Sequence, residues 1–356
     1  MRQHIIYSTI ILCTLFAACT SDENIGMFDS GNIIEFGLSQ REHTTQTRGH
    51  LYDKDSALYK EQYGGGNFWV KGYPDNTSTQ YINSRVWYFA DGERWYFRNS
   101  NEWYDSYWPK NNKLSFFAYM PWIADSAAMA IDGYSYNDGP QFSCNLPLDN
   151  HTATMNQAKL QEFVYAYTRD KKNETVPLNF VHPMSAIYFK LKQSHRDLII
   201  HSIGFEKMYS QGTYRYEEET TAENYEEYFK PGFTYDLWMP KGTRNTMSIR
   251  VEKKIPEHLN FNAEIGGPFI VMPQKFQGTN PADTLTMYVT YTWDEDVKVT
   301  KGVALKKVHN AADTGWQPGK KYTYNIDLGD NKEEILFKVM VEPWKAEDFK
   351  NIVNVE

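Results

Sequence analysis

The sequence predicts an all-β fold, and three observations carry that prediction. Apolar and polar side chains alternate over several short runs, whereas the spacing of an amphipathic helix is nearly absent. Aromatic residues make up 16% of the chain, with 26 tyrosines and 10 tryptophans, and such rings pack well across the pleated faces of sheets. Turn-forming pairs such as Pro318-Gly319 separate the runs.

The alternation is clearest in the C-terminal half of the chain. It recurs in the runs 187–191, 247–251, 285–291, 322–328 and 335–341. Each run has one apolar face and one more polar face, as strands of an antiparallel sandwich have. The polar stretch at 293–297 indicates the tip of a hairpin.

The N-terminus has the layout of a secretory signal. Arg2 precedes a largely apolar run at 5–18, which is shorter than the roughly 20 residues that a membrane-spanning helix needs. The run ends Ala17-Ala18-Cys19, which resembles a lipobox, so we expect cleavage between Ala18 and Cys19 and lipid on Cys19. The alternative is an ordinary signal peptide that is cleaved near Ala18.

A polar, acidic tether then covers residues 19–32. The acyl chains on Cys19 would insert into outer-membrane lipid, each buried CH₂ contributing about 0.8 kcal/mol. The sequence therefore predicts a lipoprotein held at the cell surface, with a β-rich body outside the membrane.

The net charge of the chain excludes two classes of partner. The net charge of −8 argues against nucleic acid and anionic lipid surfaces as partners.

The cysteines do not predict a disulfide within the chain. Cys13 lies in the signal and Cys19 is the anchor, which leaves Cys144 alone. We therefore expect no intrachain disulfide and a small buried side chain at position 144.

A chain of 356 residues usually forms two domains. The charged stretch at 169–175 is the best boundary, so we expect one sandwich over 33–174 and a second over 175–356. His182 lies just after this boundary, and we interpret it as a histidine packed at the junction rather than a metal ligand.

Several segments together resemble the fimbrillin-like proteins of Bacteroidales, the subunits of type V pili. The resemblance rests on the lipobox with its tether, on 34–36 followed by 47–48, and on 107–121, 163–166, 178–186, 269–274, 316–324 and 339–344. It implies two tandem transthyretin-like antiparallel β-sandwich domains. It also implies other pilus subunits as partners, in a homo- or hetero-polymer, with a surface glycan or protein as an adhesion target.

The resemblance further implies assembly by donor-strand exchange, in which a neighbour's strand fills a groove left by a missing strand. In pilus-forming relatives a protease cuts after an N-terminal arginine. Here Arg48 followed by Gly49 matches that place, and Ile33, Ile34 and Phe36 would belong to the removable first strand. The alternative is that Arg48 is a plain loop residue and the strand stays.

The C-terminal tail contains a short apolar alternation at Ile352, Val353 and Val355. This tail could donate a strand to a neighbouring subunit, or it could pair within its own domain. The sequence does not distinguish a stalk, tip or anchor subunit.

No motif for catalysis, metal binding or cofactor binding is present, so we expect neither an enzyme nor a cofactor. One cluster of rings within 22 positions could stack on sugars, although most of its members are expected in the core. The cluster consists of Trp87, Trp95, Tyr96, Trp103, Tyr104, Tyr107 and Trp108. A monomeric glycan-binding lipoprotein of a nutrient-uptake system is therefore the alternative to a pilus subunit.

Overall fold

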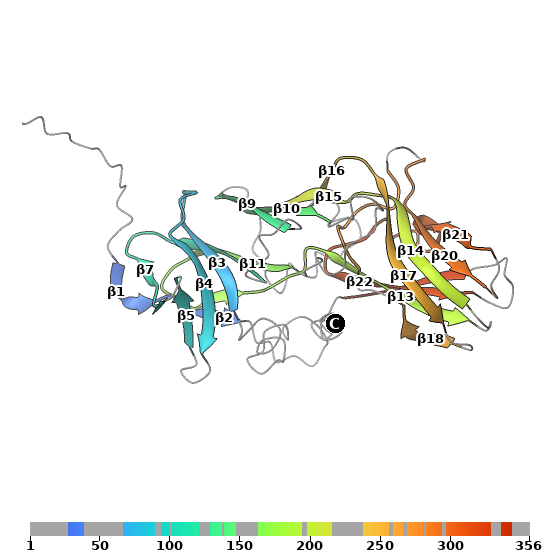
Figure 1. Cartoon of the computed structure of the whole chain (residues 1–356). Coiled ribbons are helices and arrows are strands. Elements are labelled where there is room, and N and C mark those ends of the chain that lie inside the picture. The colour runs from blue at the N-terminus through green and yellow to red at the C-terminus, as the bar shows by residue number, and fades with distance from the viewer. Residues whose placement is uncertain are drawn as a thin grey trace, which may run out of the picture.

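A computed structural model describes residues 28–38, 67–89, 94–99, 102–120, 129–136, 139–146, 163–193, 198–215, 238–255, 259–265, 269–278, 280, 282–293, 297–328 and 336–343. These residues form strands and one short 3-10 helix, η5 (Leu305–Lys307), which confirms the all-β prediction (Figure 1). Within these ranges no helix combines the length and apolar character needed to cross a membrane.

A six-stranded antiparallel sheet organises the N-terminal part. Its strand order is β11-β8-β3-β4-β5-β6. The strands are β3 (Asn67–Pro74), β4 (Ile82–Phe89), β5 (Arg94–Arg98), β6 (Trp103–Tyr104), β8 (Leu114–Met120) and β11 (Val164–Lys171). In β5 the alternation sends Trp95 and Phe97 into the core and leaves the flanking residues on the other face.

Three short strands complete the buried side of this sheet. They are β1 (Phe28–Ile33), β2 (Phe36–Leu38) and β12 (Val176–Leu178), and β1 pairs with β7 (Tyr107–Pro109). Together with one face of the large sheet they enclose the first hydrophobic cluster, which contains Phe68, Val86, Phe97, Trp108 and Phe116.

A four-stranded sheet combines strands from distant parts of the chain. Its order is β16-β15-β10-β9, from β9 (Met129–Ser135), β10 (Gly139–Asn145), β15 (Gln211–Arg215) and β16 (Trp238–Lys241). This sheet lies over the second face of the six-stranded sheet at β11, β8 and β3 (Figure 1). Phe142 of β10 packs there against Phe163 and Tyr165, with ring centroids 4.9 and 5.5 Å apart.

The C-terminal part is a sandwich of two sheets. One contains β18 (Leu259–Glu264), β13 (Ser185–Gln193), β22 (Lys320–Asp327) and β23 (Leu336–Pro343), with β19 (Phe269–Val271) also paired to β13. The other has the order β17 (Asn245–Ile255), β14 (Leu198–Met208), β20 (Thr286–Thr292) and β21 (Val299–Ala304). Phe205 joins the layers, since its ring lies 4.9 Å from Trp316 and 6.1 Å from Phe189.

Two pairings depart from the expected antiparallel pattern. β13 runs parallel to β22, and β12 runs parallel to β2. Parallel neighbours need a long connection, and the many residues between β13 and β22 provide one. Alternation fixes which face of a strand is buried, but it does not specify the direction of the strand beside it.

Residues that follow the charged stretch at 169–175 still pack with the N-terminal part. β11 continues to Lys171, and Val176, Leu178 and Phe180 pack in the first cluster with β2. We therefore propose that the boundary lies after Phe180. The pairing of β10 with β15 then joins the two parts by a shared sheet.

Candidate assembly site

The segment 28–38, here called the N-terminal segment, is held between two strands of the first domain. Ile33 of β1 lies opposite Tyr107 of β7, and the Ile34 amide donates to the Ser106 carbonyl at 2.8 Å. Three residues on, β2 pairs with β12, and the Val176 amide donates to the Glu35 carbonyl at 2.8 Å. The segment therefore connects β7 to β12 along the open side of the core.

Two of its side chains complete that core. Ile34 is fully buried and Phe36 is 4% exposed. The Phe36 ring contacts four other rings, with centroid distances between 5.4 and 6.4 Å and mostly edge-on geometry. Those rings belong to Phe68, Trp95, Phe97 and Phe116. Removing the segment would expose this aromatic surface to water.

Two ion pairs of Arg94 connect the N-terminal segment to the first domain. Arg94 of β5 donates through Nε to Glu35 Oε1 at 3.0 Å and through Nη2 to Asp105 Oδ1 at 2.8 Å. Partial burial lowers the pKa of Arg94, but its hydrogen bond to Glu35 and the two carboxylate charges leave this pKa above its ordinary value. In the sequence Glu35 is only one polar residue between two apolar ones. The sequence alone therefore does not predict that Arg94 is its partner.

A cavity of about 550 Å³ adjoins the same site. Asp105, Ser106 and Tyr107 line it. Ser106 and Tyr107 also pair with the N-terminal segment, and Asp105 binds Arg94, which holds Glu35 of that segment. Tyr81 also lines the cavity and donates its hydroxyl to the Tyr107 carbonyl at 2.9 Å. The strand that holds the segment is therefore also a wall of this cavity.

Strand β23 is the other candidate for assembly. Among the described residues it is the outermost strand of its sheet, paired only with β22. Three of its apolar side chains are exposed to solvent: Leu336 is 57% exposed, Met340 42% and Val341 40%. An edge strand with exposed apolar residues is a surface to which another strand can add.

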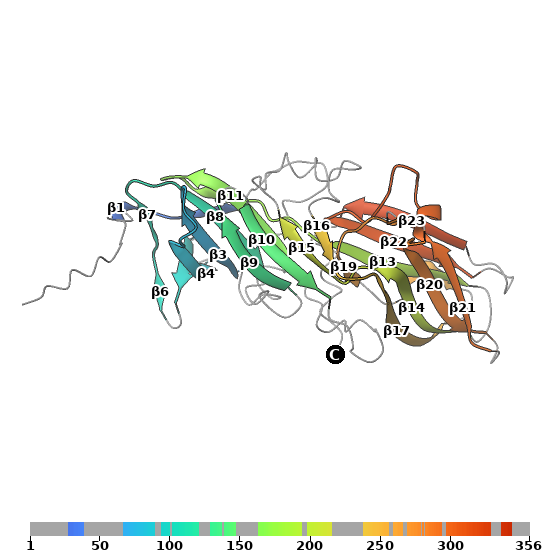
Figure 2. The same cartoon turned by 90° about the horizontal axis from the view of Figure 1, so that it is seen from above.

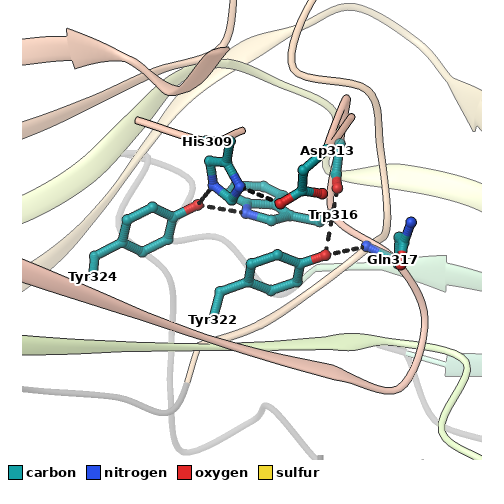
Figure 3. A network of polar contacts seen from close by, with 7 residues as sticks. His309, Asp313, Trp316, Gln317, Tyr322 and Tyr324 are labelled. Atoms are coloured by element: carbon teal, nitrogen blue, oxygen red, sulfur yellow. Dashed lines mark hydrogen bonds and ion pairs between the residues drawn. The ribbon is translucent and has the colours of Figure 1, made fainter. Parts of the chain in front are cut away.

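A buried polar network in the second domain was not expected from the sequence (Figure 3). His309 Nδ1 lies 2.5 Å from Asp313 Oδ2, and its Nε2 lies 2.8 Å from the Tyr324 hydroxyl. Trp316 Nε1 donates to the same hydroxyl at 2.9 Å. Tyr324 then donates to Nε2, and Nδ1–H donates to the carboxylate, which satisfies every member of the network.

This network fastens a loop rather than performing chemistry. The His309 side chain is fully buried, as are Trp316 and Tyr324, so no substrate reaches the imidazole. Burial raises the pKa of Tyr324 well above its ordinary value. In parallel, the Gln317 amide donates to the Tyr322 hydroxyl at 2.8 Å. The segment 309–317 is thus tied to β22.

Several predicted site residues lie outside the described residues. These are Ala18 and Cys19 of the lipid anchor, Arg48 and Gly49 of the processing site, and Ile352, Val353 and Val355 of the tail. Ile33, Ile34 and Phe36 lie within them and form the contacts given above.

Cys144 and His182 are both buried. Cys144 is a free thiol on β10, 4% exposed, and burial raises its pKa to about 12. His182 is 1% exposed, and burial lowers its pKa to about 3, so it is neutral at physiological pH. Within the described ranges no group of three potential metal-ligating side chains occurs.

The predicted aromatic cluster divides between the two faces of the sheet. Trp95 and Trp108 are buried in the first cluster, and Tyr104 packs against it. Trp87 and Tyr96 lie on the opposite face, directly across from each other in β4 and β5. Trp103 is 41% exposed.

Comparison with known sequences identifies the family. The fimbrillin-like family profile matches residues 64–344, which is most of the chain. The chain belongs to the fimbrillin-like family. Membership supports a pilus subunit or adhesin at the cell surface, in a structural role. The match begins after the N-terminal segment and Arg48.

Solved structures of fimbrial and cell adhesion proteins are similar at low sequence identity. A fimbrial protein from Bacteroides vulgatus is 15% identical, with a TM-score of 0.43 over 78% of this chain and 93% of that one. The tip fimbrial protein Mfa3 from Porphyromonas gingivalis is 9% identical, with a TM-score of 0.42 over 78% and 94%. A candidate cell adhesion protein from Bacteroides uniformis is 14% identical, with a TM-score of 0.48 over 81% and 95%. No curated protein matches the sequence.

Proposed function

We propose that this chain is a surface-anchored pilus subunit or adhesin that polymerises by donor-strand exchange. In this proposal lipid on Cys19 holds the subunit at the outer membrane until cleavage after Arg48 releases the N-terminal segment. A strand from a neighbouring subunit then fills the exposed groove, and the tail with Ile352, Val353 and Val355 is the candidate donor.

One observation carries this proposal: the segment that precedes Arg48 contributes core side chains, yet it contacts the domain along short strands. Ile34 and Phe36 are buried, while the paired lengths of β1 and β2 are only six and three residues. Such a segment is needed for a closed core, and once the chain is cut it can be exchanged. A replacement strand with apolar side chains at the same spacing would restore the buried area.

The test uses residues 20–356, treated with a low dose of trypsin and followed by denaturing gel and light scattering. We expect an early cut after Arg48, loss of the N-terminal segment and growth of detergent-resistant multimers. A matched variant, Arg48→Gln, should stay monomeric under the same treatment. Deletion of 346–356 should permit the cut but prevent growth.

A chain that is cut after Arg48 and stays monomeric contradicts polymerisation by this route. It would favour the alternative, a monomeric glycan-binding lipoprotein. If Arg48→Gln forms multimers as the parent does, then release of the segment is not the trigger.

A further inference from the structure

Strand β23 gathers exposed apolar side chains on one short element. Six large hydrophobic residues are exposed in the described part of the chain, and Leu336, Met340 and Val341 of β23 are three of them. The strand is only eight residues long. Single exposed apolar residues are ordinary on a protein surface, whereas a group of them in one place indicates a contact surface.

Register divides β23 into two faces. Its odd-numbered residues from 337 to 341 lie opposite fully buried residues of β22, so they face the core. Phe337 and Val339 pack against that core, yet Val341 is 40% exposed. The apolar row inside the sandwich therefore reaches solvent at this edge. The even-numbered residues face outward, and they are Leu336, Lys338, Met340 and Glu342.

The outward face of β23 is complementary to itself in charge. Lys338 and Glu342 lie at equal distances on either side of Met340. When two copies of such a strand run antiparallel about a twofold axis at Met340, Lys338 of each copy meets Glu342 of the other. Opposite charges at directly opposed positions stabilise a pair of strands.

The faces and the charges together select this register. Opposed residues of two paired strands point to the same face, so even-numbered residues must oppose even-numbered ones. An axis at position 338 would oppose two lysines, and one at 342 would oppose two glutamates. An axis at 339 or 341 would oppose a charged residue to Met340. The axis at Met340 avoids all of these mismatches and sets Val339 of one copy beside Val341 of the other.

We propose that β23 pairs edge to edge with β23 of a second copy of this chain, antiparallel and centred on Met340. Among the described residues β23 pairs only with β22, so its other edge can donate and accept the hydrogen bonds of a further strand. Each Val341 is then covered by Val339 of the other copy. The sheet β18-β13-β22-β23 continues into the second molecule.

This contact is lateral. β23 runs roughly along the long axis of the molecule (Figure 2), so the two copies lie side by side and point in opposite directions. The contact does not involve the N-terminal segment or the C-terminal tail. It is therefore separate from the joining of subunits by donor-strand exchange.

Two residues of β23 restrict which strand can pair with it. Lysine and proline on an edge strand usually keep other strands away. Lys338 disfavours any strand without an acid at the opposed position, and a second copy supplies Glu342 there. Pro343 is the last residue of β23, so its missing N–H falls at the end of the pair. The edge thus accepts a copy of itself more readily than an unrelated strand.

The first test is sedimentation velocity over a range of concentrations, on residues 20–356 without protease. This chain retains every described strand. We expect a weak dimer that dissociates on dilution, because one pair of short strands forms a small interface. Lys338→Glu and Glu342→Lys should each weaken dimerisation about tenfold, since like charges replace both ion pairs. The double variant Lys338→Glu/Glu342→Lys should restore the affinity of the parent to within about twofold.

The second test is cross-linking through an introduced cysteine. In Met340→Cys the two thiols are directly opposed, with Cα atoms about 5 Å apart, which suits a disulfide. Leu336→Cys is the matched control: position 336 is more exposed, but its two copies would lie about 27 Å apart along the strands. Mild oxidation should therefore yield a covalent dimer from Met340→Cys alone. The parent should give none, because Cys144 is buried.

Four results would overturn the proposal. They are a protein that stays monomeric at every concentration, single charge reversals that dimerise as the parent does, a double reversal that does not recover, and Leu336→Cys that cross-links as readily as Met340→Cys. A dimer that forms only after deletion of 346–356 would also overturn it, since the tail would then cover β23 in the longer chain. Thermal unfolding verifies that each variant is folded.

The failure of this inference can be distinguished from the failure of the proposed function. Arg48→Gln should leave the β23 dimer intact, and that dimer should dissociate in denaturing detergent, unlike the multimers expected after trypsin. Dimers without trypsin-induced multimers would support this contact and contradict donor-strand exchange. Multimers without dimers would do the reverse.

Discussion

Arg94 binds Glu35 at 3.0 Å although 59 positions separate them in the chain. The contact links the third strand of a meander, β3-β4-β5, to the segment that fills its core. Because Arg94 also binds Asp105, one guanidinium joins three parts of the first domain. The bridge therefore bears directly on how readily the N-terminal segment is released.

Replacing Arg94 by Gln should loosen that segment without unfolding the domain. The bridge is partly exposed, so we expect a loss of about 1 kcal/mol in the free energy of unfolding, smaller at high salt. Hydrogen exchange of the amides of 28–38 should speed up. The control is Lys192→Gln, which breaks the pair with Asp327 in the other domain and should leave exchange in 28–38 unchanged. Equal exchange in both variants would contradict the role of the bridge.

Phe36→Ala should have a larger effect because it empties a space among four rings. Phenylalanine truncations in cores cost about 3 kcal/mol or more. We expect this loss in urea unfolding, together with faster tryptic release of the N-terminal segment. Phe205→Ala, in the second sandwich, should lower stability by a comparable amount and leave that release rate as in the parent. If the two variants release the segment equally fast, Phe36 is not a specific anchor.

Stability should fall in acid because of His182. Its folded pKa of about 3 lies below the ordinary value of 6.5, so between these pH values the unfolded chain binds a proton that the folded one does not. The free energy of unfolding should therefore decrease as pH falls from 6.5 toward 3, by up to about 1.4 kcal/mol per pH unit. His182→Gln should remove this slope, whereas His201→Gln, at a surface pair with Glu252, should retain it. A pH profile unchanged by His182→Gln would refute the assignment.

Tyr324→Phe and Tyr322→Phe separate the two halves of the polar network. The first leaves both Trp316 Nε1 and His309 Nε2 without their shared oxygen, and we expect a loss of about 2 kcal/mol or more. The second removes the acceptor of the Gln317 backbone amide and a long 3.4 Å donation to the Gly315 carbonyl, and should cost about 1 kcal/mol. Thermal unfolding of the two variants provides the comparison, and a larger loss in Tyr322→Phe would contradict the network as described.

Local pattern predicted the strands but not their neighbours. The alternations at 187–191, 285–291 and 322–328 correspond to β13, β20 and β22, because burial of one face leaves a period of two in the sequence. The hairpin expected around 293–297 is the antiparallel pair β20–β21. The parallel register of β13 with β22 depends on a long connection and leaves no such trace.

The same limit applies to the candidate sites. Ile34 and Phe36 could be proposed from alternation and resemblance, whereas the Arg94 bridge and the edge position of β23 depend on which strands pair. His309 and Asp313 are four residues apart, yet their function in the network requires Tyr324 from another strand. Contacts between distant segments were the part that the sequence could not supply.

The shared sheet bears on how the subunit transmits tension. Five consecutive residue pairs join β10 to β15, and Figure 2 shows these strands running roughly along the long axis of the molecule. A pull along that axis loads their hydrogen bonds in shear, so the bonds must fail together instead of opening one after another. The two halves would then resist separation as one stiff unit, with no flexible linker between them to extend first. A fibre made from such units would resist stretching.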